Sequence, residues 1–419
     1  MTRAAYLAYE PADEDAARHV SAELERNGWA VRARDANQAD AQRIQTIANA
    51  GVVFVLASAA AEQSDAVRRD AEAALNNGRR TIVIQTGPLA QASWLHASLD
   101  LAAAIDMRAG ADAETLTRIS TAAQNAGGGG RVIAMLNIKG GVGKTVLAAN
   151  LFAAAHLADK RAISFIDLDP QHNLTQYFLS AGERHRIRER NHTIYNVLTP
   201  SGEASLARND FGAIAVPLNR TKRGKPPNFE LLAGDERLFE YTLDTRSETD
   251  KAMAFTRFRA LVAALRARSD AVIIDSNPCA TFLTRLALTC ADHIVAPVRP
   301  EKYSLTGLNM LEHVAREVRG RPLRPDEFSV LLNGVNDRTR SGETASADAH
   351  TRTEIAGAPF FGAAFLEEEV PYAAALKSAP SDKFAANPIN VTAMMRVGGR
   401  PAKEALANAA AAILRRAAP

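Results

Sequence analysis

The sequence predicts two α/β domains, each built on a parallel sheet, and three observations support this fold class. Short apolar runs alternate with amphipathic stretches of helical length, a pattern typical of strands separated by helices. Residues 126–130 read Ala-Gly-Gly-Gly-Gly, the composition of a flexible linker. Residues 1–126 hold 12 arginines and 16 acidic residues, a formal charge of −4, and since the whole chain carries +3, the remainder carries +7. We therefore expect domains at 1–125 and 131–419, joined by a linker at 126–130.

Five strands are predicted in the first domain, at 4–9, 29–34, 52–58, 81–85 and 102–107, with helices at 16–26, 38–50 and 61–75. This alternation predicts a flavodoxin-like parallel sheet with helices on both faces. A response-regulator receiver and a TIR domain both have this order of elements. A receiver needs an aspartate after its third strand and a lysine after its fifth. Here Ala57 and Ser58 end the third strand, and no lysine precedes Lys139. Phosphoacceptor chemistry is therefore excluded.

The first domain resembles a TIR domain over residues 1–125. The strand 5–9, the segment 28–31, and the strand 53–58 with the following Ser64 match that family in order. Catalytic TIR domains carry a NAD-cleaving glutamate at the position that here holds Asp70, with Glu72 two residues further on. Aspartate is one methylene shorter, and a displacement near 1 Å can cost about 10²-fold in rate. The resemblance therefore implies an interaction or oligomerisation domain more readily than an NADase.

The second domain opens with a glycine-rich loop directly after the apolar run 132–136. Residues 137–145 read Asn-Ile-Lys-Gly-Gly-Val-Gly-Lys-Thr. Glycines in such a loop let successive backbone N–H groups turn toward phosphate oxygens, the lysine adds a positive charge, and the threonine hydroxyl binds Mg²⁺. We assign nucleotide binding to Gly140, Gly141, Val142, Gly143, Lys144, Thr145 and Val146.

This loop departs from the ordinary pattern, which needs a glycine where the chain has Ile138 and no lysine at position 139. The string Lys-Gly-Gly-Val-Gly-Lys-Thr resembles the deviant Walker A motif of ParA/MinD ATPases, and the chain from Arg131 onward is similar to the ParA branch. The resemblance implies a P-loop NTPase with a doubly wound parallel sheet, ATP and Mg²⁺ as cofactors, and an ATP-dependent homodimer. In that family the lysine at the position of Lys139 reaches the partner's phosphates and acts in catalysis, as an arginine finger does.

The resemblance continues in a first switch. Residues 167–173 read Asp-Leu-Asp-Pro-Gln-His-Asn, after the strand 162–166. By this correspondence Asp169 orients the attacking water, while Asp167 lies near the metal and holds the loop. A carboxylate suits the first task because the nucleophile needs a hydrogen-bond acceptor. Lys139, Lys144 and Asp169 are therefore the expected catalytic residues.

A Walker B strand at 272–275 ends in Asp275, which completes the expected metal residues with Thr145 and Asp167. The family continues with two prolines, whereas here Asn277 precedes Pro278. That change loosens a rigid turn in the second switch.

The remaining motifs follow in family order to about residue 415. The segments 229–235, 291–301 and 330–336 resemble the family's later strands. Asn333 corresponds to the asparagine that reads adenine, because an amide accepts from N6 and donates to a ring nitrogen. Asn333, Pro297 and Arg299 complete the predicted nucleotide site.

The resemblance also implies partners, since ParA relatives bind DNA nonspecifically and a ParB-like adaptor stimulates their hydrolysis. Nonspecific binding needs clustered cations. The candidates are Arg338, Arg340, Arg352, Lys377, Lys383, Arg396, Arg400, Lys403, Arg415 and Arg416. The basic segments 182–191 and 222–227 are further candidates for contact with DNA or a partner.

The sequence predicts a cytoplasmic protein that associates with the nucleoid. Its two cysteines indicate neither a disulfide framework nor a zinc site, and the amino terminus has no signal peptide. The MinD branch attaches to membranes through an amphipathic tail, but segment 405–416 is mostly alanine, which buries little area. A packed final helix is expected instead.

Three functions from different classes remain. The first is a ParA-type ATPase that positions or segregates DNA or another cargo, with the first domain recruiting partners. The second is an ATP-switched TIR signalling or defence protein that cleaves NAD. The third is a ParA-like localisation factor for a secretion or pilus system. ATP-dependent DNA binding favours the first, NAD consumption the second, and polar localisation without either activity the third.

Overall fold

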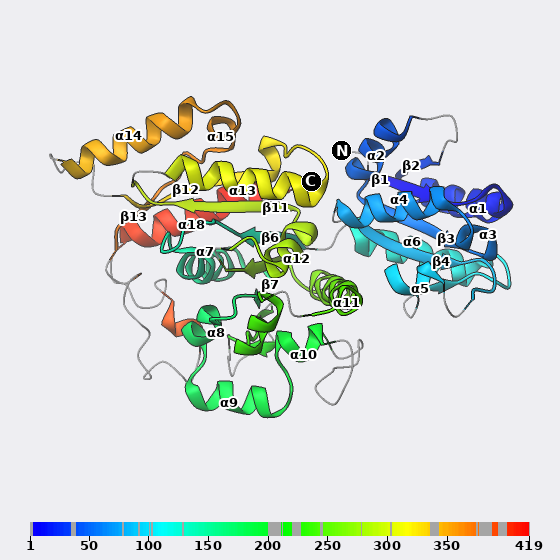
Figure 1. Cartoon of the computed structure of the whole chain (residues 1–419), viewed down its shortest axis with the longest axis horizontal. Helices are drawn as coiled ribbons and strands as arrows, with labels where there is room; N and C mark the ends of the chain where they lie inside the picture. The colour runs from blue at the N-terminus through cyan, green and yellow to red at the C-terminus, as the bar shows by residue number, and fades with distance from the viewer. Residues whose placement is uncertain are drawn as a thin grey trace. The chain divides into compact units, whose positions relative to one another are not determined.

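The computed structural model divides the chain into two compact units, Met1–Gly129 with Lys251–Ala263, and Gly130–Asp250 with Ala264–Pro419. Each unit has its own sheet (Figure 1). The structure describes residues 3–418 except 35–38, 78, 91–92, 100, 102–103, 128–129, 200–210, 212, 220–227, 244–245, 278, 302–303, 336–342, 374–375, 377–387 and 393–399.

The first unit is a five-stranded parallel sheet with helices on both faces, as predicted. Its elements are β1 (Arg3–Ala8), η1 (Pro11–Asp13), α1 (Glu14–Arg26), β2 (Trp29–Ala33), α2 (Asp40–Asn49), β3 (Val52–Ala57), α3 (Ala59–Glu62), α4 (Asp65–Asn76), β4 (Arg80–Gln85), α5 (Trp94–Ser98), β5 (Ile105–Asp106) and α6 (Ala113–Gly127). The strand order is β2-β1-β3-β4-β5. Every residue of β3 is buried because α1 and α6 cover one face of the sheet, and α2 and α4 the other.

Two elements of this unit differ from the prediction. The helix expected at 61–75 is two helices, α3 and α4, because the Ser64 hydroxyl accepts the N–H of Val67 at 3.1 Å and caps α4. The last strand, β5, has only two residues. At the carboxyl edge of the sheet, the Asp13 carboxylate accepts the hydroxyls of Ser58 and Thr86, each at 2.7 Å. Internal hydrogen bonds therefore occupy the place where a receiver would hold its phosphoacceptor.

The predicted linker at 126–130 differs from the structure at both ends. Helix α6 includes Ala126 and Gly127, whereas 128–129 lie outside the described residues. Gly130 is buried, and its N–H donates to the carbonyl oxygen of Arg266 at 3.0 Å. A Cβ on Gly130 would lie 1.9 Å from the carbonyl oxygen of Ser269. This glycine therefore serves close packing beside the start of β6.

The second unit carries the larger sheet. Its elements are β6 (Arg131–Met135), α7 (Lys144–Asp159), β7 (Ile163–Asp167), α8 (Asn173–Phe178), α9 (Ala181–Glu189), α10 (Ile194–Leu198), β8 (Val216–Pro217), β9 (Phe229–Leu232), η4 (Glu236–Tyr241), β10 (Ala271–Asp275), α12 (Phe282–Cys290), β11 (His293–Val298), α13 (Ser304–Arg319), η5 (Pro325–Glu327), β12 (Phe328–Val335), α14 (Glu343–Gly357), α15 (Pro359–Ala364), β13 (Val370–Pro371), η7 (Pro388–Val391) and α18 (Arg400–Arg416). Most of helix α11 (Glu248–Arg266), residues Lys251–Ala263, belongs to the first unit.

The strand order β13-β12-β11-β6-β10-β7-β9-β8 is that of a doubly wound sheet with its switch point at β6. All pairings are parallel except that of β8 with β9, where the connection 218–228 is too short for a helical crossover. The carboxyl ends of the central strands are neighbours, since Asp275 pairs in register with Met135 and with Asp167. The fold therefore brings the loops after β6, β7 and β10 together.

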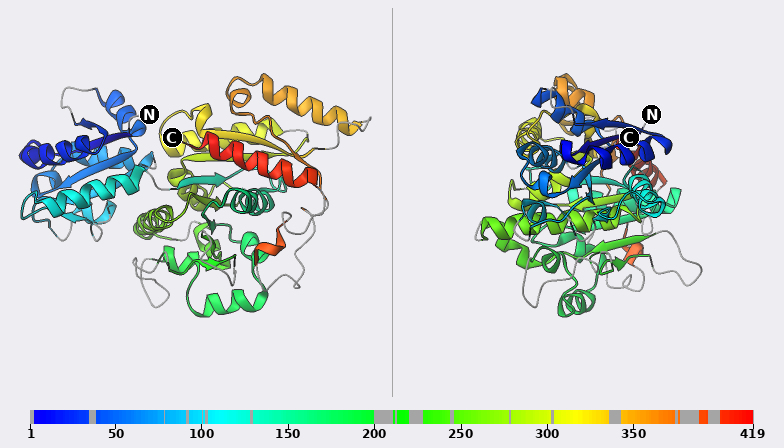
Figure 2. Two further views of the ribbon diagram at one scale, coloured as in Figure 1. Left: turned by 180° about the vertical axis from the view of Figure 1, so that it is seen from behind. Right: turned by 90° about the vertical axis from the view of Figure 1, so that its right-hand side faces the viewer.

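The final helix is part of the core of this unit. Helices α7 and α18 lie side by side on one face of the sheet (Figure 2). Leu406 and Ile413 of α18 are fully buried in the same hydrophobic cluster as Leu151 and Phe152 of α7. In the part of the chain that the structure describes, no helix is both long and apolar enough to cross a bilayer.

Candidate functional site

The phosphate-binding loop connects β6 to α7. Gly141 and Gly143 have φ angles of +73° and +95°, a region that glycine adopts without strain. Helix α7 begins at Lys144 with Gly143 as its N-cap. The unpaired N–H groups of its first turn adjoin the loop, and together with the helix dipole they favour bound phosphate.

Lys139 is held by its own chain at the rim of this loop. Its Nζ forms an ion pair with Glu301 Oε2 at 2.8 Å, with the two side chains 30% and 49% exposed. Its backbone N–H donates to Asn137 Oδ1 at 2.9 Å, and Asn137 Nδ2 donates to the carbonyl oxygen of Pro297 at 2.7 Å. The lysine therefore lies at a solvent-accessible edge, which is compatible with a reach toward a partner subunit.

Asp275 is the residue best placed to hold a cation. It is fully buried, and neither carboxylate oxygen has a hydrogen-bond donor among the described residues. Burial raises the pKa of Asp275 well above its usual range, and the charge of Asp167 adds to this rise. The Thr145 side chain lies close enough to favour the charged form of Asp275 and so opposes this rise in pKa, but its geometry is not that of a hydrogen bond. A divalent cation beside Thr145 would satisfy these oxygens.

The donor set fits Mg²⁺ bound jointly with a nucleotide. Within the described residues there is no group of three or more His, Cys, Asp or Glu side chains that would hold a metal alone. Mg²⁺ commonly takes one or two protein carboxylates plus phosphate oxygens and waters. Thr145 and Asp275 would supply the protein side of that shell.

Asp167 instead fixes the first switch to the sheet. Its Oδ2 accepts both the N–H and the hydroxyl of Thr175 on α8, each at 2.7 Å. The Thr175 hydroxyl in turn accepts the N–H of Gly234 at 2.8 Å. Burial raises the pKa of Asp167 to about 7. These hydrogen bonds connect the first switch to α8. The other carboxylate oxygen of Asp167, Oδ1, accepts the N–H of Asp169 at 3.4 Å.

Lys144 and Asp169 lie close to Asp275, and both are only 8% exposed. Burial lowers the pKa of Lys144, and the charges of Asp275 and Asp169 oppose that shift. Asp169 Oδ1 accepts the N–H of Gln171 at 2.9 Å. Its Oδ2 has no donor among the described residues and is available to a water molecule.

The asparagine in the second switch is anchored rather than loose. Asn277 is 8% exposed, and its Oδ1 accepts the hydroxyl of Thr284 on α12 at 3.2 Å. The same hydroxyl also contacts the carbonyl oxygen of Cys279. A side-chain hydrogen bond therefore restrains this turn in place of the missing proline ring.

A cavity adjoins the loop at the end of β12. It is lined by Gly143, Val146, Leu147, Arg299, Asn333, Gly334, Pro371, Tyr372, Ala373 and Leu376. Asn333 Nδ2 donates to the carbonyl oxygen of Val142 at 2.8 Å, and its Oδ1 has no donor among the described residues. The Nε of Arg299 is buried without an acceptor. Pro297 does not line this cavity.

The two acidic residues proposed for the TIR-like site do not come together. Asp70 is 1% exposed and accepts Tyr6 Oη at 2.9 Å and Arg43 Nε at 2.7 Å. Glu72 lies on the exposed side of α4, where it pairs with Arg68 at 3.0 Å. This geometry gives Asp70 a structural role in the core.

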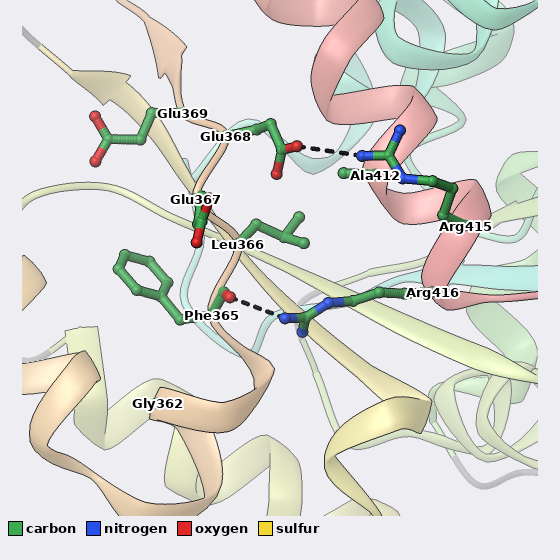
Figure 3. Close-up of a pocket in the computed structure, with 9 residues that line it drawn as sticks. All are labelled: Gly362, Phe365, Leu366, Glu367, Glu368, Glu369, Ala412, Arg415 and Arg416. Atoms are coloured by element: carbon green, nitrogen blue, oxygen red, sulfur yellow. Dashed lines mark hydrogen bonds and ion pairs between the residues drawn. The ribbon is translucent and has the colours of Figure 1, made fainter.

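The described cations near the carboxyl terminus are mostly paired within the chain. Arg352 forms two hydrogen bonds to Glu369, at 2.5 and 2.8 Å. A second cavity lies between residues 362–369 and the end of α18 (Figure 3). There Arg415 lies 3.4 Å from Glu368, and Arg416 donates to the carbonyl oxygen of Phe365 at 3.1 Å.

Lys403 is half-buried on α18. Arg338, Arg340, Lys377, Lys383 and Arg396, the side chain of Arg400 and the segment 222–227 lie outside the described residues.

Three residues of the site escaped the sequence reasoning. Thr175 and Gly234 connect the first switch to the loop after β9, and Glu301 holds Lys139. Gly234 and Glu301 lie in the segments 229–235 and 291–301, which resemble later strands of the family. Their contacts are between residues distant in sequence, and spacing alone carries no signal of such contacts.

A glycine loop at the start of α7, with acidic residues ending β7 and β10, defines a P-loop nucleotide-binding protein. A family model described as an AAA domain matches residues 130–326. The chain is 32% identical over 212 residues to an uncharacterized protein of Pseudomonas putida, covering 49% of this chain and 70% of that protein. The chromosome partitioning protein ParA of Caulobacter vibrioides is 29% identical over 255 residues, 60% of this chain and 84% of that protein.

Among solved structures, a plasmid partition protein from Borrelia burgdorferi aligns over 63% of this chain and 97% of that chain, with a TM-score of 0.43 and 21% identity. The chain belongs to the ParA family of P-loop ATPases. The family predicted from the glycine loop and the switch motifs is thereby confirmed.

Proposed function

We propose that the chain is a Mg²⁺-dependent ATPase that dimerises on ATP to position or segregate DNA or another cargo, with the first unit recruiting a partner. The observation that carries the proposal is the buried, donor-free carboxylate of Asp275 beside Lys144 and Asp169. A buried carboxylate without donors is costly unless a cation completes it. Its position at the phosphate-binding loop supports a metal–nucleotide complex.

Each residue then has a distinct task in hydrolysis. The loop N–H groups and Lys144 would hold the phosphates, and Thr145 and Asp275 would hold Mg²⁺, whose charge would offset that of the phosphate oxygens. The free Oδ2 of Asp169 accepts a hydrogen bond from the attacking water and keeps it in line with the γ-phosphate. Asp167 positions this switch through Thr175.

Adenine selectivity follows from the one remaining acceptor of Asn333. Its amide nitrogen is already committed to Val142, so Oδ1 faces the cavity as an acceptor. The exocyclic amine of adenine can donate to it, whereas the O6 of guanine would place two acceptors together. The base cavity therefore supports ATP rather than GTP.

Dimerisation requires Lys139 to exchange one anionic partner for another. In the single chain its partner is Glu301. In the proposed dimer the phosphates of the facing subunit take the place of Glu301. The lysine then stabilises the negative charge of the transition state from outside the glycine loop of that subunit. The excess of +7 in residues 127–419 supports contact with DNA phosphates, and a ParB-like adaptor is the proposed stimulating partner.

The test is fluorescence anisotropy of a nonspecific DNA duplex with the full chain, in ATP, in ADP and without nucleotide, at low and moderate salt. Phosphate release is measured in the same samples. The expected result is binding that appears only with ATP and weakens steeply as salt rises. The matched control is Asp275→Asn, which should hydrolyse no ATP and show no ATP-dependent binding.

ATP hydrolysis without DNA binding in any nucleotide state would exclude the proposed binding to DNA. The remaining hypothesis would then be a ParA-like localisation factor. Absence of both would overturn the proposal. An NAD-cleaving alternative gains no support from Asp70, whose carboxylate is committed to Tyr6 and Arg43.

A further inference from the structure

An exposed aromatic ring borders the base cavity. Tyr372 follows β13, is 53% exposed, and lines the cavity that also contains Gly143 and Asn333. Its backbone N–H donates to the carbonyl oxygen of Val335 at 2.8 Å. The backbone of this residue is therefore fixed to the end of β12, while about half of the residue's surface is exposed.

The walls of the cavity have the chemistry of a nucleobase site. Val146 and Leu147 come from the first turn of α7, and Pro371 and Leu376 from the opposite segment. These apolar surfaces suit the faces of a flat ring. At the edges, Asn333 Oδ1 and the buried Arg299 Nε are a free acceptor and a free donor within the described part of the chain.

The position of the cavity relative to the phosphate-binding loop suits a whole nucleotide. Gly143 belongs to both, because it is the N-cap of α7 and also lines the cavity. A ligand whose phosphates lie on the loop would place its base between the first turn of α7 and Tyr372.

We propose that Tyr372 is the base-stacking residue of this site, so that its ring supplies affinity for a purine nucleoside triphosphate while Asn333 supplies the choice of adenine. This inference rests on the proposed ATP site and deepens it. Stacking on an aromatic ring depends little on the identity of the base, because every base has a π face. Affinity and selectivity are thus divided between two residues, Asn333 in β12 and Tyr372 directly after β13.

The first experiment measures equilibrium binding of a fluorescent ATP analogue to the full chain, with ATP and inorganic tripolyphosphate as competitors. Tyr372→Ala should weaken ATP binding about tenfold, whereas Tyr372→Phe should match the parent chain, because a phenyl ring retains the stacking face. Tripolyphosphate has no base, so its affinity should be the same in all three. The control is Leu243→Ala, a site 56% exposed that does not line the cavity.

A second variant gives a direct signature of stacking. In Tyr372→Trp, ATP should quench the fluorescence of the added indole ring. The parent chain, measured in the same way, gives the contribution of Trp29 and Trp94, which is subtracted. ATP affinity unchanged in Tyr372→Ala, or an equal loss for ATP and tripolyphosphate, would overturn the stacking role. Failure of the parent chain to bind ATP would instead overturn the proposed function, and this inference with it.

Discussion

Gly234 lies at the narrowest point between two loops of the nucleotide site. Its N–H donates to Thr175, whose hydroxyl donates to Asp167. A Cβ at this position would lie 2.7 Å from the Cβ of His172 and 2.9 Å from Asp167 Cγ. The first switch and the loop after β9 therefore approach each other only because this residue has no side chain.

Gly234→Ala should disturb the first switch and lower ATP turnover at least tenfold. Overpacking of this kind usually costs about 1–3 kcal/mol of stability, which urea unfolding of the variant would show. The control is Gly182→Ala on α9, where no atom lies within 4 Å of the added Cβ. Parent-like turnover in Gly234→Ala would mean that the switch relaxes without consequence.

Asp70 is the candidate for NAD cleavage in the sequence, and the fold buries its carboxylate against Tyr6 and Arg43. Asp70→Asn should destabilise the first unit by about 3–5 kcal/mol, because it removes the buried anionic partner of Arg43 and leaves that side chain only its ion pair with the exposed Asp40. The control Glu72→Gln breaks only an exposed pair and should stay within about 0.5 kcal/mol. Chemical denaturation monitored by Trp29 fluorescence gives both values. NAD consumption by the parent chain that disappears in Asp70→Asn at unchanged stability would restore the enzymatic role.

At the scale of elements, the amino ends of β11 and β12 are joined through a buried histidine. His293 Nε2 lies 2.8 Å from Ser329 Oγ, and Nδ1 lies 3.1 Å from the carbonyl oxygen of Asp326. Burial lowers the pKa of His293 to about 4, and the nearby Arg416 and Arg319 act in the same direction. The folded chain therefore keeps this ring neutral where an unfolded chain would protonate it.

This histidine predicts a loss of stability in mild acid. Below an unfolded pKa near 6.5, the unfolded state binds a proton that the folded state does not, so stability falls until the pH reaches the folded value. The loss from this group alone should be about 2 kcal/mol between pH 7 and pH 5. This contribution is isolated by measuring the free energy of unfolding of the parent chain and of His293→Gln at both pH values. The variant should lose less stability than the parent chain on going from pH 7 to pH 5. Equal losses in both proteins would remove His293 as the cause.

The last helix, α18, contributes to the core beside α7. Ile413→Ala should destabilise the second unit by about 2–5 kcal/mol, because the side chain is fully buried and leaves a cavity. Lys403→Ala on the same helix is the control and should change stability by less than about 0.5 kcal/mol. Both values come from urea unfolding. An effect of Ile413→Ala no larger than that of the control would argue against a packed final helix.

At the scale of the whole molecule, the proposed ATP-dependent dimer requires Lys139 of one subunit to reach the phosphates of the other. The ion pair of Lys139 with Glu301 shows where the lysine lies in a single chain. Lys139→Ala should abolish the ATP-dependent dimer, and light scattering with and without ATP measures it. Glu301→Gln is the matched variant, which should retain or increase the dimer because it removes the ion pair that joins the lysine to its own chain. A dimer fraction unchanged by Lys139→Ala would contradict the proposed contact of this lysine with the phosphates of the facing subunit.

Much of the fold follows from local physics that a sequence displays. Short apolar runs such as 52–57 and 271–275 are typical of buried strands, and glycines before a lysine at a helix start are typical of an anion site. The family motifs likewise lie in contiguous segments. These features depend on neighbours in sequence, so the second unit, its glycine loop and the order of its motifs were all predicted.

Tertiary structure alone decided the rest, because those features depend on residues far apart in the chain. The burial of Asp70 against Arg43, the ion pair of Glu301 with Lys139 and the placement of Tyr372 beside the cavity that Asn333 lines each join separate elements. The packing of Gly130 against Ser269 likewise replaced an expected linker end with a buried contact. The sequence by itself determined which chemistry the chain carries. The fold determined which side chains remain available for that chemistry, because burial and pairing are set by the neighbours that folding brings together.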